Sequence, residues 1–216
     1  MVPILQPELS NPLYLKLVCE TLKLKGLKCL PTGWFGLSPV IRAFLDEKEK
    51  QFSRDYEGVS AGANIISGSL LGIAKAIAQS GEMALPWSDA QRVVIEKRPQ
   101  AATLPVLDWL VRAELLIEDG PGDNGLGAEN VLRPAFERFG DFLIAAELLQ
   151  SGQPNRLKQG LWPNQNIEPL FASAFSVDQN SGVIQALSVL LPEMFNHELP
   201  DLIKDACIRQ KARAIA

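Results

Sequence analysis

Residues that build catalytic and metal sites are scarce in this sequence. His197 is the only histidine, and the three cysteines are odd in number and far apart, so neither a zinc-ligand spacing nor a disulfide framework is present. A Ser/His/Asp triad would depend on that one histidine, and no such arrangement is evident. The phosphate-binding pattern GxxxxGK(S/T) is absent, as is a Gly-rich strand-to-helix turn of the dinucleotide type. We therefore expect that the chain is not an enzyme by itself and binds no metal.

Signals for export and for membrane insertion are also missing. The sequence shows no signal peptide and no unbroken apolar run long enough to cross a bilayer. The spacing of the cysteines suits a reducing compartment. A net charge of −4 gives the whole molecule no attraction to nucleic acid or to an anionic membrane. These features favour a cytoplasmic protein.

What the sequence does contain is a series of helical patterns, beginning within residues 1–56. Asn11 is a preferred N-cap and Pro12 occupies the first helical position, where its missing N–H is harmless. Apolar residues then recur at helical spacing, and Gly26 is a natural stop. A second amphipathic helix ends in the charged run "DEKEKQ" (46–51), which we expect to be a solvated face.

Residues 57–150 predict a winged helix-turn-helix. A helix rich in small residues, from about Ser60 to Gln79, precedes a possible short strand in "EMALP". A helix opened by a capping box at Ser88 follows, and then a helix in "LPVLDWLVRAELL". Two short strands, "LLIED" and "NVLRP", flank a Gly-rich turn, and an amphipathic helix, "FERFGDFLIAAELLQ", closes the region.

Residues 151–216 predict shorter helices separated by joints rich in Pro, Gly and Asn. The helical patterns lie around 167–176, 180–191 and 198–213. They could begin a helical array, although the sequence shows no clear period. The fold class that we expect is therefore mainly α, with a helical segment, a winged helix with a small β wing, and a C-terminal helical segment.

A winged helix suggests DNA binding, but the charges of this one argue against it. Residues 85–134 contain five basic and eight acidic residues. The predicted recognition helix carries Asp108 and Glu114 against only Arg112, and the wing is acidic. Neutralisation of phosphates supplies most non-specific DNA affinity, and here the positive charge is lacking. A module for protein contacts is the better interpretation.

Two stretches, taken in order, resemble a known family. "ELSNPLYLKLVCETL" (8–22) is similar to the start of the helical lid in STAND NTPases of the NACHT kind, which include bacterial antiviral members called AVAST proteins. "VLRPAFERFGDFLIAAELL" (131–149) is similar to the helix that closes their winged-helix domain, often written as an aromatic-Glu-Arg-Phe core followed by D-x-L-x-A. Here that core is FERF (136–139). The resemblance covers residues 8–150.

The resemblance implies a nucleotide site. In such proteins a P-loop domain binds ATP or ADP, the proline of the lid's Asn-Pro-Leu packs near the adenine, and the winged helix covers the nucleotide in the resting state. Carried over, Pro12 is a candidate adenine contact; the alternative is a good first-turn residue and nothing more. Many NACHT proteins touch the β-phosphate with a histidine, and Phe136 stands near its expected place. Arg138 could supply the positive charge instead, or could simply form a surface ion pair with a neighbouring carboxylate.

The P-loop domain itself is the main departure from the family. Nothing before Ser10 could encode it, so we expect a fragment of a split or truncated gene, or a shortened piece of a longer protein, that binds no nucleotide alone. The leading hypothesis is the regulatory middle of a signalling switch, with lid (1–56), winged helix (57–150) and the start of a sensor region (151–216). Its partners would be the P-loop domain and a protein trigger. The alternatives are a winged-helix transcription regulator and a stand-alone interaction scaffold.

Overall fold

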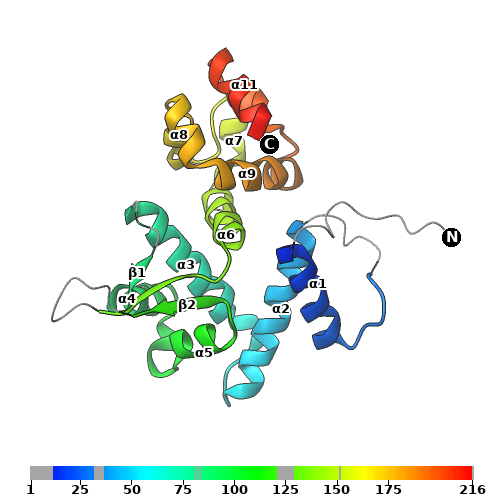
Figure 1. Cartoon of the computed structure of the whole chain (residues 1–216), viewed down its shortest axis with the longest axis vertical. Helices are drawn as coiled ribbons and strands as arrows, with labels where there is room; N and C mark the ends of the chain where they lie inside the picture. Colours follow the sequence, from blue (N-terminus) through cyan, green and yellow to red (C-terminus); the bar gives the residue numbers. More distant parts are fainter. Residues whose placement is uncertain are drawn as a thin grey trace.

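The computed structural model of the chain describes residues 12–31, 37–80, 82, 84–120, 129–150 and 152–215. Helices dominate, with one small antiparallel sheet of three strands (Figure 1), so the predicted mainly α character is confirmed. None of the helices within those residues has the length and apolarity to cross a membrane. The elements, in chain order, are α1 (Pro12–Lys25), α2 (Leu37–Asp55), the 3-10 helix η2 (Ala61–Ala63), α3 (Ile65–Ser80), β1 (Leu85–Pro86), α4 (Trp87–Lys97), the 3-10 helix η3 (Pro99–Thr103), α5 (Val106–Arg112), β2 (Leu116–Asp119), β3 (Val131–Pro134), α6 (Glu137–Gln150), α7 (Pro154–Leu157), the 3-10 helix η4 (Gln165–Phe171), α8 (Ala174–Gln179), α9 (Ser181–Phe195), α10 (Leu199–Leu202) and α11 (Ala206–Ile215).

Helices α1 and α2 pack side by side as one helical pair (Figure 1). The first helix begins at Pro12 as predicted; its predicted cap, Asn11, lies outside the described residues. It ends at Gly26, which has a left-handed φ of 64°. The N–H of Leu27 donates to the carbonyl of Leu22 at 2.9 Å, which closes the helix with a Schellman motif. The predicted stop is therefore confirmed.

The third helix begins later than predicted. Ser60 caps only the short turn η2, where its side chain accepts a hydrogen bond from the N–H of Gly62 at 3.2 Å. Asn64 then takes a left-handed conformation, with a φ of 50°, and α3 starts at Ile65. The small residues of this region favoured one continuous helix, but the left-handed residue interrupts it.

Gly72 of α3 is required by its close packing against α4, whereas Gly68 faces the movable end of the Arg98 side chain, just after α4. An added Cβ at Gly68 would lie 2.5 Å from Nε of Arg98, and one at Gly72 would lie 2.9 Å from a methyl group of Val93. Contacts below about 3 Å force a shift in the neighbour. The Gly-containing stretch "SGSLLGIAK" therefore lies inside a helix and serves helix packing.

The sheet has the strand order β1-β3-β2, and all its neighbours are antiparallel. Leu132 on the central strand faces Leu85 on one side and Glu118 on the other, and its side chain is fully buried. All three strands fall within the predicted segments. The predicted Gly-rich turn lies mostly outside the described residues, since 121–128 are not described.

The predicted capping box at Ser88 is wrong. Helix α4 begins one residue earlier, at Trp87, and its capping position makes no side-chain hydrogen bond. Ser88 instead donates both its backbone N–H and its hydroxyl to the carboxylate of Glu129, with 2.8 Å between the hydroxyl and Oε2. The N–H of Trp87 also donates to the carbonyl of Asn130 at 2.9 Å. A residue distant in the sequence has thus replaced the local cap.

Helix α6 stands at the centre of the molecule, between the sheet-bearing part and the helices α7–α11 (Figure 1). It packs on α3 with one side and along α9 with another. Its apolar residues Phe139, Phe142, Leu143 and Ala146 are buried, as expected of an amphipathic helix, and Phe136, directly before it, is half-buried. The predicted patterns at 167–176 and 198–213 each divide into two helices in the structure, whereas the one at 180–191 corresponds to the single helix α9.

The charged run of α2 is not the solvated face that its composition suggested. Glu47, Lys48 and Glu49 are only 6%, 8% and 5% exposed. Buried charges are costly unless they are paired or hydrogen-bonded. Glu47 pairs with Lys50 on the same helix and with Lys25 of α1. Lys48 and Glu49 find their partners on other elements, and these contacts are described next.

Candidate functional site

The two residues predicted to contact nucleotide both lie at the surface. Pro12 is exposed on the first turn of α1, and Arg138 is exposed on the first turn of α6. Within the described residues Arg138 forms no ion pair, so the alternative of a surface salt bridge is not observed there. A role for either residue in binding nucleotide remains a prediction.

The two stretches that carry the family resemblance meet in space. Lys16, one turn after Pro12 on α1, places its ammonium 4.7 Å from the ring centre of Phe136, directly before α6. Leu17 and Phe139 line a common hollow of about 10 Å³ in the same place. That volume is about enough for one water molecule. The start of α1 therefore packs against the start of α6.

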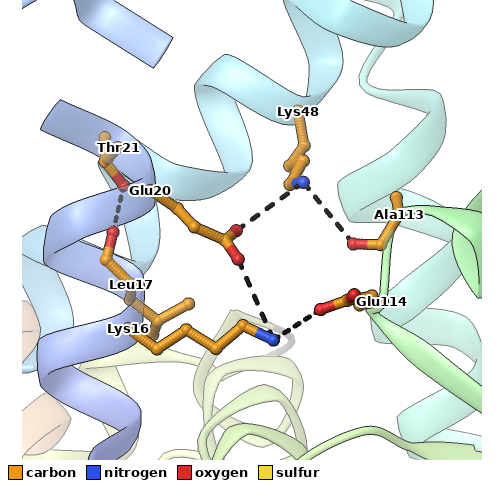
Figure 2. Close-up of polar contacts among 7 residues, drawn as sticks. All are labelled: Lys16, Leu17, Glu20, Thr21, Lys48, Ala113 and Glu114. Carbon is orange, nitrogen blue, oxygen red and sulfur yellow. Dashed lines mark hydrogen bonds and ion pairs between the residues drawn. The ribbon is translucent and has the colours of Figure 1, made fainter. Parts of the chain in front are cut away.

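Four charged side chains form a polar joint around this contact (Figure 2). We use the term polar joint for Lys16, Glu20, Lys48 and Glu114. The ammonium of Lys16 lies 2.7 Å from Glu114 and 3.8 Å from Glu20, whose other oxygen lies 3.8 Å from Lys48. The joint thus connects α1, α2 and the turn between α5 and β2.

Lys48 is the most buried member of the polar joint. Its ammonium donates to the carbonyl of Ala113, at 3.5 Å, where the chain leaves α5. A cation is favoured at this end of a helix, because the last carbonyls carry partial negative charge. Burial lowers the pKa of Lys48 below its usual value, although the carboxylates of Glu20 and Glu114 oppose this effect. The long side chain therefore links α2 to the end of α5.

Glu114 is held in an unusual backbone conformation. Its φ is 55°, in the left-handed region that residues other than glycine seldom occupy. The hydrogen bond from Lys16, and the positive charge behind it, lower the pKa of Glu114 below its usual value. Its backbone and side chain are both engaged, since its N–H donates to the carbonyl of Val111 at 3.0 Å. The joint therefore coincides with a point of local strain.

A second set of contacts joins glutamates to serines at the starts of three helices. Each serine is the second or third residue of its helix, and each glutamate comes from a different element. The carboxylate of Glu49 accepts from the N–H and the hydroxyl of Ser67, at 2.7 and 2.8 Å. Negative charge is stabilising at a helix start. The three pairs are Glu193 with Ser38 on α2, Glu49 with Ser67 on α3, and Glu129 with Ser88 on α4.

These arrangements orient helices, and the hollows among the described residues are small. A hollow between α4, η3 and α5, lined by residues such as Trp87 and Leu104, measures about 60 Å³. Sites for small molecules usually measure several hundred Å³. A search of the described residues found no group of three or more His, Cys, Asp or Glu side chains that could hold a metal ion.

The polar joint was not predicted from the sequence. Only the pair Lys16 and Glu20 carried a signal, because residues four apart lie on one face of a helix. Lys48 was assigned to a solvated face, and Glu114 was counted only as an unfavourable charge for DNA binding. Their partners lie too far along the chain for local patterns to reveal.

Comparison with known proteins does not assign a family. No family model matches the sequence, and no curated protein is significantly similar to it. The resemblance to STAND NTPases is therefore carried by the two motif stretches of this chain, and their consequences are taken up as a proposal.

Proposed function

We propose that this chain is the regulatory middle of a nucleotide-dependent signalling switch of the STAND kind, similar to NACHT proteins. Residues 1–56 would be the lid, 57–150 a winged-helix domain, and 151–216 the start of a sensing region. A P-loop domain holding ADP or ATP, and a protein trigger bound through the C-terminal helices, would bias the molecule between closed and open states. The chain itself would perform no catalysis.

The observation that carries this proposal is the meeting of the two motif stretches. They lie more than a hundred residues apart in the sequence, and each resembles a segment that contacts one nucleotide in the family. Lys16 on α1 lies over the ring of Phe136, and Glu114 pairs with the same lysine. A nucleotide bound by a neighbouring domain at this junction would therefore touch both stretches at once.

The order of the elements supports a winged helix in the middle of the chain. Helix α3, strand β1, helices α4 and α5, and the antiparallel strands β2 and β3 follow one another as in a winged helix-turn-helix. Protein contact suits this one better than DNA contact. Trp109 of α5 donates to Asp55 of α2 at 2.8 Å, and Arg112 donates to the hydroxyl of Tyr56 at 3.2 Å, so α5 is already engaged by α2. A complex in a low-salt gel shift would favour the transcription regulator instead.

Calorimetric titration with ADP tests the proposal. The 216-residue chain alone should give no binding heat, because it lacks a P-loop. A longer chain that joins these residues to a P-loop domain of this kind should bind, and in it Pro12→Ala and Arg138→Gln should each weaken binding about tenfold, which corresponds to about 1.4 kcal/mol.

Pro154→Ala is the matched control, since Pro154 is also the first residue of a helix but lies on α7. It should leave the affinity unchanged. Tight ADP binding by the isolated 216 residues, or equal effects of the two proline variants, would contradict the proposal.

A further inference from the structure

The contact between α6 and α9 contains a carboxyl group placed directly against a glycine. Gly182 is the second residue of α9, and an added Cβ there would overlap the carboxyl group of Asp141 on α6. The glycine therefore leaves the room that this carboxyl group occupies, and its backbone angles do not call for a glycine. Helix α9 packs along α6, and α8, α10 and α11 pack on α9. The contact between Asp141 and Gly182 therefore helps to hold the C-terminal helices on the rest of the molecule.

The carboxyl group of Asp141 is half-buried and lacks the partners that a charge removed from solvent needs. It makes no hydrogen bond or ion pair with the described residues. Burial raises its pKa to about 6, the nearby carboxylate of Glu137 adds to this effect, and Arg138 opposes it. Asn180, the N-cap residue of α9, makes no side-chain capping bond. Its side chain therefore accepts no hydrogen bond from the N–H groups in the first turn of α9.

The charged residues of α9, α3 and β3, the elements that pack most closely on α6, are engaged elsewhere. Helix α9 has one charged residue, at the far end from Gly182, and α3 and β3 have one each. No neutralising charge therefore comes to Asp141 from these elements. The three residues and their partners are Glu193 with Ser38 and Arg42, Lys75 with Glu147, and Arg133 with Asp119.

We propose that the contact of Asp141 with Gly182 is a pH-responsive joint that holds α9 against α6 when the carboxyl group is protonated and loosens when it ionises. A neutral carboxyl group packs against Gly182 without cost from desolvation of a charge. An ionised one needs hydrogen bonds to replace those lost from solvent. A helix start favours such a charge, but no N–H of the first turn of α9 donates to Asp141 in this arrangement, so the contact must open before water or those N–H groups can supply them. This inference concerns the packing of the C-terminal helices and does not depend on nucleotide binding.

The direction of the pH effect follows from the raised pKa. The usual pKa of an aspartate is 3.8, and in the folded protein it is about 6. The folded state therefore keeps its proton over a range in which the unfolded chain has lost it. Stability of the contact is fully present below the unfolded value and is lost as the pH rises through the folded value.

Hydrogen exchange of the α9 amides tests the pH response of the contact between Asp141 and Gly182. Protection factors, corrected for the intrinsic exchange rate, are measured at about pH 5 and about pH 7.5. We expect protection of α9 in the natural protein to fall by about tenfold over this range, an effect expected of a raised pKa after allowing for partial solvent screening. In Asp141→Asn, which cannot ionise, the fall should disappear. Asp178→Asn, which changes an exposed carboxylate paired with Lys211, should keep it.

A second variant keeps the proposal testable if Asp141→Asn alters the fold. Gly182→Ala inserts a methyl group where the carboxyl group lies, so protection of α9 should be low at both pH values. Gly62→Ala, where the added Cβ meets only ordinary contact with Ser60, should behave like the natural protein. The same pH response in Asp141→Asn as in the natural protein would overturn the proposal. So would protection that rises with pH, since the carboxylate would then act as a cap for α9.

Discussion

Helices α1 and α5 end with the same backbone geometry but with different residues. In both, an N–H just past the helix donates to the carbonyl five residues earlier. The donor is Leu27 and the acceptor Leu22 at the end of α1, and the donor is Leu115 and the acceptor Leu110 at the end of α5. The left-handed position is Gly26 in α1, with a φ of 64°, and Glu114 in α5, with a φ of 55°. A glycine accepts this conformation freely, whereas another residue pays about 1 kcal/mol or more.

The difference shows which helix end is decided locally. Gly26 stops α1 by its own conformational freedom, and no Cβ would meet a neighbour there. Glu114 stops α5 against its own preference, and its side chain reaches Lys16 of α1 at 2.7 Å. Where a residue departs from the local rule, a contact with a distant element accompanies the departure. The strained turn lies in the polar joint, next to the contact between α1 and α6.

The largest effect is expected where a distant residue supports a helix start inside the core. Glu49→Ala should destabilise the protein by about 2 kcal/mol, because the N–H and the hydroxyl of Ser67 lose their acceptor in a partly buried place. Urea unfolding measures the change. Glu57→Ala, at an exposed glutamate near the end of α2, should change stability by less than about 0.5 kcal/mol. Equal effects of the two variants would show that the distant cap contributes nothing.

A smaller effect is expected at the locally determined helix end. Gly26→Ala should destabilise the protein by about 1 kcal/mol, because alanine must enter the left-handed region. Thermal unfolding would detect a fall in Tm of several degrees or less. Gly120→Ala is the control, since its Cβ would meet no neighbour and its φ lies outside that region. If Gly26→Ala were as stable as Gly120→Ala, α1 would not depend on the glycine.

The smallest net effect is expected at Glu114, where two terms oppose each other. Glu114→Gly relieves the backbone strain and loses the ion pair with Lys16, whereas Glu114→Ala loses the ion pair and keeps the strain. The two variants should therefore differ in stability by the same amount as Gly26 and Gly26→Ala do. Urea unfolding at low salt and at about 1 M salt separates the terms, because salt screens the ion pair and leaves the strain unchanged. A salt-independent loss in Glu114→Ala would contradict a role for the ion pair.

Most of the secondary structure could be predicted from the sequence because the patterns are local. The alternation of apolar residues located α1, α2, α4, α5, α6 and α9, and the short apolar runs located all three strands. The predictions are wrong where the start of a helix, or the burial of a charge in the polar joint, depends on a residue that is distant in the sequence. Ser88 was predicted to cap α4 by itself, and Glu129 supplies the acceptor instead.

The candidate site was predicted only in part. Pro12 and Arg138 came from the family resemblance, and the structure places the two helix starts that carry them side by side through Lys16 and Phe136. The polar joint could not be predicted, since Lys48 and Glu114 read as solvated charges. A sequence pattern records the spacing of residues along one element, and the burial of a charge depends on which other elements pack over it.

By itself, the sequence determined the mainly helical character, the places of the strands and the stop of α1. Periodicity and the backbone freedom of Gly26 act within a few residues, so they need no tertiary contact to be effective. Only the tertiary structure decided that the middle of the charged run of α2, residues 47–49, is buried, that Glu114 ends α5 in a left-handed conformation, and that Asp141 lies against Gly182. Each of these depends on desolvation and on the approach of a second element, which the local sequence does not contain.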